Sequence, residues 1–219
     1  STAQFLRVGA GARALGMGDA FGPIAEGPDA IYWNPAGLAS VGRLDLAYTH
    51  VEMLRHFHHD YVGLAHPVPW LGGAAGFAMT TLYQDKIERV TRVNKSAGEF
   101  GAHSEAFSIA YARSFGVGED FRGRDRGYFE DYYHLRGSDL PLYHEGDVWV
   151  GSLKTGLAFK FISETIDDHN ALAFAADGGV LFNHSVIQEL KLSFTFRNLG
   201  TRPRFIAEVT DGHLDVGVE

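Results

Sequence analysis

The sequence predicts an all-β protein built from antiparallel strands. Beyond a glycine-rich N-terminal stretch, apolar and polar residues alternate with a period of two, which places successive side chains on opposite faces of a strand. No helical pattern alternates with these stretches, so parallel βαβ units are not expected. No run of about 18 apolar residues occurs, which excludes a transmembrane helix, whereas the alternating strands of a membrane barrel remain compatible with the sequence.

Residues 1–42 lack this alternation and are predicted to form short helical turns. Glycine and other small residues fill the run 8–18, and a second motif covers 29–38. Asp29 is the expected N-cap of a turn, because its carboxylate can accept a backbone N–H. We expect a break near Pro35–Gly37, since proline and glycine both interrupt helices.

Eight stretches carry the strand pattern, at 43–51, 60–66, 73–83, 105–115, 153–162, 170–182, 190–197 and 213–219. The clearest is 190–197, where Leu190, Leu192, Phe194 and Phe196 alternate with Lys191, Ser193, Thr195 and Arg197. Tight turns are expected at 167–170 and 183–185. Residues 116–147 have no clear period, and we interpret them as an inserted loop.

Composition and motifs exclude several function classes. A net charge of −8 argues against a nucleic-acid surface, and the absence of cysteine rules out disulfides and thiolate sites. No nucleophile elbow or paired-carboxylate motif is present, so neither catalysis nor a cofactor is expected. His50, His56, His58, His59 and Asp60 form the one dense histidine cluster, which we interpret as a polar loop in preference to a metal site.

Alternation alone leaves two architectures open, a soluble β-sandwich and a membrane β-barrel. Two observations favour the barrel. Several stretches reach about 9–11 residues, which is the length that a tilted strand needs to cross a bilayer. Their polar faces consist of small residues with isolated charges, at Lys154, Lys160, Asp177, Lys191 and Arg197.

Specific motifs resemble an outer-membrane family. Residues 11–20 (GARALGMGDA) and 29–38 (DAIYWNPAGL) are similar to the N-terminal signature of PorV/PorQ proteins, and the NPAG core is shared with FadL-like transporters. Residues 157–162 (LAFKFI), 175–182 (AADGGVLF) and 197–200 (RNLG) resemble strand motifs of the same family. The resemblance extends with gaps from about residue 5 to residue 200.

The resemblance implies an antiparallel transmembrane barrel of about 14 strands with a short helical plug in its lumen. Residues 1–42 would be the plug, and residues 43–219 would form an incomplete barrel that includes the inserted loop 116–147. Their length suffices for roughly nine strands, so several C-terminal strands are expected to be missing from this sequence.

The same resemblance implies a non-enzymatic protein of a Gram-negative outer membrane. The sequence is more similar to the PorV group, in which the barrel is a docking or carrier component of type IX secretion and surface attachment. Its expected partners are outer-membrane lipid, other secretion or envelope proteins and exported C-terminal domains, but not nucleic acid. Two alternatives stay open: a FadL-like channel for hydrophobic compounds, and a soluble or surface-lattice β-protein.

Two sets of site residues follow from this interpretation. The residues expected to hold or gate the plug are Arg13, Asp29, Trp33, Asn34, Pro35 and Gly37. The residues expected to face the lumen are Lys154, Lys160, Asp177, Lys191 and Arg197, paired with one another or with acidic residues of the plug, because charge in a spanning strand must avoid lipid.

Overall fold

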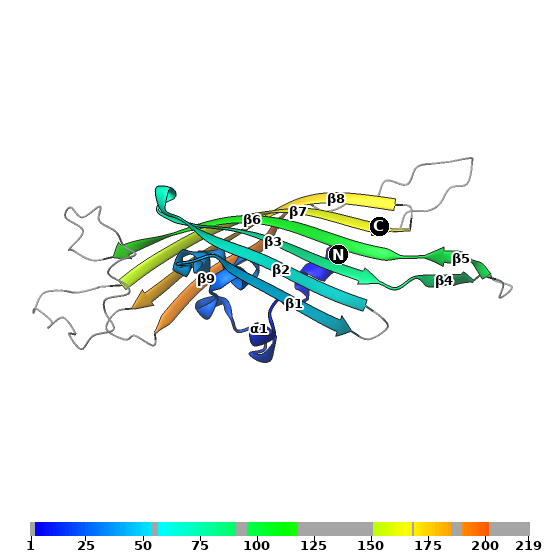
Figure 1. Ribbon diagram of the computed structural model, residues 1–219, viewed down its shortest axis with the longest axis horizontal. Coiled ribbons are helices and arrows are strands. Elements are labelled where there is room, and N and C mark those ends of the chain that lie inside the picture. Colours follow the sequence, from blue (N-terminus) through cyan, green and yellow to red (C-terminus); the bar gives the residue numbers. More distant parts are fainter. Residues whose placement is uncertain are drawn as a thin grey trace, which may run out of the picture.

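A computed structural model shows a long, curved antiparallel sheet with a set of short helices packed against one face (Figure 1). The structure describes residues 3–53, 57–90, 96–117, 151–167, 169–184 and 190–201. The predicted strand at 213–219 and nearly all of the predicted insert 116–147 therefore lie outside the described residues. Gly116 and Val117 are the exception, and they belong to a strand.

The N-terminal segment, defined here as residues 3–44, contains only short helical turns because glycine and proline interrupt it repeatedly. Its elements are η1 (Gln4–Arg7), α1 (Ala12–Gly16), η2 (Gly22–Ile24), η3 (Gly27–Asp29), α2 (Ala30–Trp33) and η4 (Pro35–Ser40). The predicted capping role of Asp29 is wrong, because Asp29 itself has helical backbone angles and its side chain caps nothing. Asn34 is the cap instead, and its side chain accepts a hydrogen bond from the Ala36 N–H at 3.1 Å.

Seven strands form the main sheet, and each is antiparallel to its neighbours. In spatial order they are β1 (Asp45–Met53), β2 (Phe57–Val68), β3 (Gly73–Gln84), β6 (Ala102–Val117), β7 (Gly151–Ile166), β8 (His169–His184) and β9 (Lys191–Gly200). A separate hairpin of β4 (Ile87–Val90) and β5 (Ser96–Phe100) extends the connection between β3 and β6, and η5 (Pro69–Leu71) joins β2 to β3.

The predicted all-β fold is confirmed, and each predicted stretch between 43 and 197 lies on a strand of the main sheet. All of these strands except β1 are longer than predicted. His169 and Asn170 already belong to β8, as do Asn183 and His184, so the predicted turns are shorter at both ends of that strand. The β4–β5 hairpin was not predicted.

The two faces of the sheet differ in the way that the alternation requires. One face carries small residues, as in the register row Ala65, Gly76, Ala110, Ala158 and Asp177. Apart from Ala176, residues of the neighbouring row on the opposite face are large and apolar: Leu46, Leu64, Phe77, Ile109, Phe159 and Leu199.

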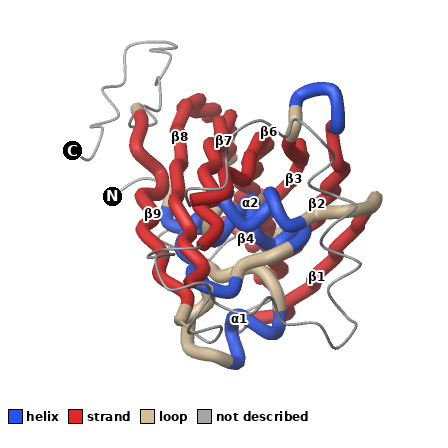
Figure 2. Tube along the Cα trace, turned by 90° about the vertical axis from the view of Figure 1, so that its left-hand side faces the viewer, coloured by secondary structure: helices blue, strands red, loops and turns tan. Residues whose placement is uncertain are grey.

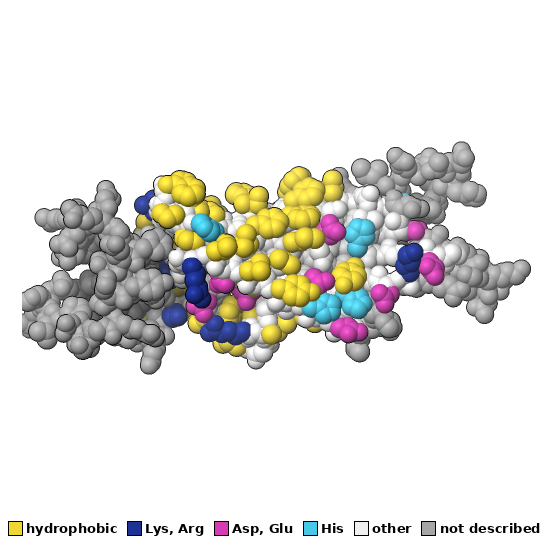
Figure 3. Space-filling view, in the orientation of Figure 1, with side chains coloured by type: hydrophobic (Ala, Val, Ile, Leu, Met, Phe, Trp, Pro, Cys, Tyr) yellow, Lys and Arg dark blue, Asp and Glu magenta, His cyan; other side chains and the backbone are white. Residues whose placement is uncertain are grey.

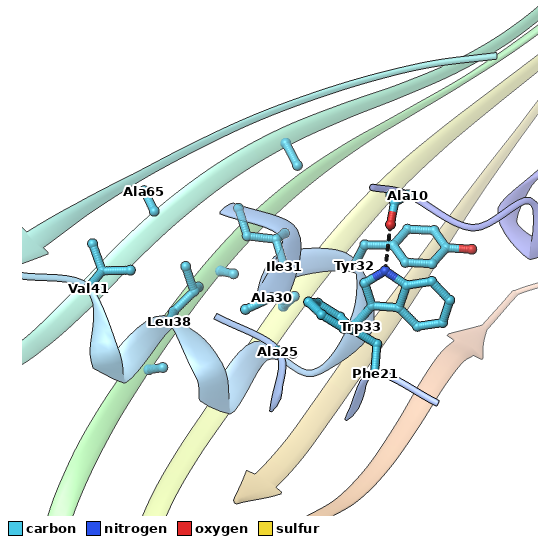
Figure 4. Packing of buried hydrophobic residues seen from close by; sticks show 14 of the residues in the cluster. Ala10, Phe21, Ala25, Ala30, Ile31, Tyr32, Trp33, Leu38, Val41 and Ala65 are labelled. Atoms are coloured by element: carbon cyan, nitrogen blue, oxygen red, sulfur yellow. Dashed lines mark hydrogen bonds between the residues drawn. The ribbon is translucent and has the colours of Figure 1, made fainter. Parts of the chain in front are cut away.

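The N-terminal segment lies on the concave, small-residue face, and the sheet curves around it (Figure 2). Figure 4 shows Ile31, Trp33 and Leu38 of this segment packed in a buried cluster beside the strands. Glycines of the sheet make this approach possible. A Cβ on Gly76 would lie 2.7 Å from Ile31 Cδ1, and one on Gly156 would overlap the backbone between Pro35 and Ala36.

The main sheet is open. Strands β1 and β9 form its two edges, and within the described residues they do not pair with each other. In the part of the chain that the structure describes, backbone groups along these two edges lack the ladder partners that every inner strand has.

Candidate functional site

The convex face of the sheet exposes a continuous apolar surface, called here the apolar band. Its most exposed members include Ile109 (67%), Phe159 (66%) and Phe194 (69%). These large side chains gather over the middle of the strands (Figure 3). A folded water-soluble protein rarely exposes an apolar patch that crosses a whole sheet, so such a surface indicates contact with lipid or another protein.

The apolar band ends in polar residues on the same face. His50 Nδ1 and the Tyr48 hydroxyl both lie against the Asp60 carboxylate, at 2.8 and 2.9 Å. The ring of His58 stacks between those of His50 and Tyr83, with centroids 6.0 and 5.0 Å apart. Figure 3 shows histidines and acidic side chains gathered toward this end of the strands. Along β1, β2 and β3, the convex face therefore changes from apolar to polar.

The predicted histidine cluster is divided between the two faces of the sheet. His50, His58 and Asp60 lie on the convex face, whereas His59 points to the concave face and is fully buried. His56 lies outside the described residues. Among the histidines and acidic residues that the structure describes, no group of three or more is arranged to hold a metal ion.

A buried ion pair lies on the concave face between β7, β8 and β9. Lys160 Nζ is 2.5 Å from Asp177 Oδ2, and the exposed fractions of the two residues are 4% and 0%. Asn198 completes the cluster, because its side-chain oxygen accepts from Lys160 Nζ at 2.9 Å and its backbone N–H donates to Asp177 Oδ1 at 2.7 Å. The Asp177 carboxylate thus neutralises the charge of Lys160 within the cluster.

A β-bulge positions Asn198 for these contacts. The register shifts between Ala176 and Gly178, so that Arg197 and Asn198 of β9 together lie opposite Asp177. Asn198 has φ +57°, a left-handed conformation that asparagine tolerates better than most residues. Because of the bulge, the backbone N–H of Asn198 and the side chain of Arg197 both make contacts on the concave face.

Two aromatic residues of α2 face this part of β9. The Tyr32 hydroxyl donates to the carbonyls of Leu6 and Val8, and Trp33 Nε1 donates to the carbonyl of Ala10 at 2.7 Å (Figure 4). Arg197 Cζ lies 5.6 Å from the centre of the Tyr32 ring and 5.1 Å from that of Trp33. Burial raises the pKa of Tyr32 to about 12, against the opposing effect of the Arg197 charge, so this hydroxyl stays protonated.

The other residues that were predicted to hold the plug differ in how deeply they are buried. Asn34 is fully buried and also donates to the Gly22 carbonyl at 3.2 Å, and Gly37 is so close to Ala25 that a Cβ would overlap its carbonyl. Arg13 is exposed and pairs with Glu26 at 2.9 Å.

Asp29 is half-buried beside Gly11, and its Oδ1 has no hydrogen-bond partner in the described part of the chain. Burial raises the pKa of this carboxyl, and the nearby Asp45 adds to the effect.

The other expected charges also lie on the concave side. Lys154 Nζ contacts Ser40 Oγ of the N-terminal segment at 2.7 Å, and Lys191 follows the same parity on β9 as Arg197. The structure thus brings Lys160, Asp177 and Arg197 together beneath α2, with Lys154 apart from them near η4. The roles of Asn198 and Tyr32 were missed, although the three-residue step from Phe196 to Leu199 breaks the period of two and signals a bulge.

Comparison with protein-family models, curated proteins and solved structures finds no match to this chain. Within the described residues, no helix has the length and apolar character needed to cross a membrane.

Proposed function

We propose that this chain forms part of the wall, together with the plug, of an outer-membrane β-barrel. Its role is that of a non-enzymatic docking or carrier component in protein secretion and surface attachment, as in the PorV proteins that its motifs resemble. The observation that carries the membrane assignment is the apolar band on the convex face. The opposite face, where a soluble sandwich would place its large apolar residues, holds mainly small residues and buried charges, with Tyr61, Ile162 and Leu181 as its large apolar exceptions.

The length of the apolar band supports a bilayer as its environment. On β7, outward-facing apolar residues run from Leu153 to Phe161, and Ser163 and Thr165 follow. Nine residues at about 3.3 Å each, tilted by roughly 40°, span about 23 Å along the membrane normal. Barrels of the outer membrane present an apolar band about 25 Å tall, so the two values agree.

Membrane insertion also requires that both sheet edges find partners. Unpaired backbone groups in hydrocarbon cost several kcal/mol each, so β1 and β9 must pair with further strands in the bilayer. We therefore propose a closed barrel of which β1–β3 and β6–β9 are one section. The N-terminal segment, which already lies on the concave face, is then the plug.

The docking role is favoured over a channel for hydrophobic compounds by the chemistry of the concave face. A hydrophobic path needs an apolar lining, whereas the concave face beside α2 carries Lys160, Asp177 and Arg197. A surface-lattice protein is the third alternative, and its exposed apolar band would have to contact protein instead of lipid.

Native mass spectrometry of the chain extracted from outer membranes in mild detergent tests the proposed function. We expect it to carry the C-terminal domain of an exported protein or another secretion component. A matched variant replaces residues 118–150 by a short glycine-containing turn, which is feasible because Val117 and Gly151 are register partners. Loss of the partner from this variant alone would assign docking to the insert. A protein that carries only lipid or fatty acid would contradict the docking role and favour transport.

A further inference from the structure

A polar cavity of about 570 Å³ lies between the N-terminal segment and the edge strand β9. Its size is within the range of about 300–1,000 Å³ that small-molecule sites occupy. The residues that define its character are Arg7, Asp19, Tyr32 and Trp33 of the segment, with Arg197 and Asn198 of β9. The membrane assignment accounts for the inward position of Arg197, but not for a second arginine, Arg7, on the wall of the same cavity.

The guanidinium of Arg197 is exposed, but its position is restricted by two aromatic rings. The rings of Tyr32 and Trp33 are fixed by their hydrogen bonds to the backbone of residues 6–10, and Arg197 lies over both rings. Cation–π contact leaves the N–H donors at the rim of the guanidinium plane unused. A preorganised guanidinium binds an oxyanion at a smaller entropic cost than a mobile one.

The charges around the cavity do not cancel. The nearby Lys160 is neutralised by Asp177, but within the described residues neither Arg7 nor Arg197 has a carboxylate within 4.0 Å. Among the described residues that line the cavity, Asp19 is the one acidic residue, against two arginines. Asn198 adds an amide donor, because its side-chain oxygen is already engaged by Lys160.

We infer that this cavity binds a small polar ligand through an oxyanion, a carboxylate or a phosphate, that accepts paired hydrogen bonds from Arg197. Arg7 supplies the second positive charge, and the Asn198 amide supplies a further donor. A guanidinium can donate paired hydrogen bonds to a carboxylate or to a phosphate, so the inference covers both classes of ligand. This inference goes beyond the proposed function, because it assigns a small ligand to the cavity and not a secretion partner.

The test uses the chain folded in detergent micelles, with Trp70→Phe and Trp149→Phe so that Trp33 is the sole tryptophan. Sodium phosphate and sodium acetate are titrated separately at constant ionic strength, and binding is followed by Trp33 emission and by calorimetry. Saturable binding of either anion is expected, and the anion that saturates at lower concentration identifies the class. Linear, non-saturating responses to both anions would overturn the inference.

Variants separate a specific site from general attraction. Arg197→Lys should weaken binding by about tenfold, because lysine cannot present paired donors, and Arg197→Gln should abolish it. Arg7→Gln, at an exposed position, provides a second variant with several-fold weaker binding expected. Arg13→Gln is the matched control, because Arg13 pairs with Glu26 outside the cavity and its loss should leave anion binding unchanged. Equal binding by Arg197→Gln and the parent would also overturn the inference, whether or not the chain inserts into membranes.

Discussion

At the scale of single residues, the buried pair of Lys160 and Asp177 has the largest expected effect on stability. Lys160→Met leaves a buried carboxylate without its cation, which costs about 3–5 kcal/mol of unfolding free energy. Lys154→Met is the matched control on the same face of β7, because Lys154 makes a single contact with Ser40 at a more exposed position. We expect the control to lose less than about 1 kcal/mol, measured by urea unfolding of the chain in micelles.

The double variant Lys160→Met/Asp177→Asn distinguishes charge from packing. Asparagine keeps an acceptor for the Asn198 N–H and removes the uncompensated charge. Most of the loss should therefore be recovered in the double variant. Equal losses in Lys160→Met and Lys154→Met would show that the pair is not buried as described.

The buried carboxyl of Asp29 makes the stability of the folded chain depend on pH. Burial raises its pKa in the folded state above the ordinary value of 3.8, so the folded chain binds a proton more tightly than the unfolded chain. This contribution to stability is therefore unfavourable above the folded-state pKa, and it is relieved as the pH falls through that pKa towards the unfolded value.

Asp29→Asn should accordingly raise the unfolding free energy at pH 7, and the gain should disappear near pH 4. Urea midpoints of the variant and the parent across this range provide the measurement. Arg13→Gln serves as a comparison, because Arg13 lowers the pKa of Asp29 and its removal should destabilise the chain slightly at pH 7. A gain that is the same at both pH values would contradict the assigned cause.

At the scale of elements, the contact between η4 and the sheet depends on glycine. A Cβ on Gly156 would overlap the backbone between Pro35 and Ala36, so Gly156→Ala must displace η4. We expect a loss of about 1–3 kcal/mol and faster proteolysis of the N-terminal segment. Gly101→Ala is the control, because nothing lies within 4 Å of its Cβ position. Proteolysis at equal rates in both variants would mean that the segment is not packed on the concave face.

Several elements could be predicted from the sequence because their period is a local property. Leu157, Phe159 and Phe161 alternate with small or charged residues, and this pattern needs no knowledge of strand order. Contacts across strands could not be predicted in the same way. The pairing of Lys160 with Asp177 depends on the register of β7 and β8, and the position of Arg197 over Trp33 depends on how two distant segments pack.

Caps and turns were predicted less well for a related reason. Asp29 and Asn34 are both residue types that cap helices, and only the backbone angles decide between them. The β4–β5 hairpin lacks a clear period of two, so the sequence carried no signal for it. His58 and His59 were grouped because they are adjacent, whereas neighbouring residues of a strand point to opposite faces.

At the scale of the whole molecule, the apolar band and the open edges of the sheet have one explanation in common, a closed barrel in a bilayer. Phe159→Arg places a charge in the middle of the band and should cost about 2–4 kcal/mol in lipid. Ser163→Arg lies on the same face of β7 beyond the band and should cost at most about 1 kcal/mol. Folding in lipid vesicles measures both. Equal costs within about 0.5 kcal/mol would indicate that Phe159 faces water.

Nitroxide scanning along the convex face of β7 tests the membrane assignment most directly. The chain contains no cysteine, so Leu157→Cys, Phe159→Cys, Phe161→Cys and Thr165→Cys each introduce a single labelling site. In vesicles, we expect the first three labels to be accessible to oxygen and protected from a water-soluble nickel complex, with the reverse at residue 165. Exposure of all four labels to the nickel complex, or immobilisation of the first three against protein, would contradict a lipid-facing band.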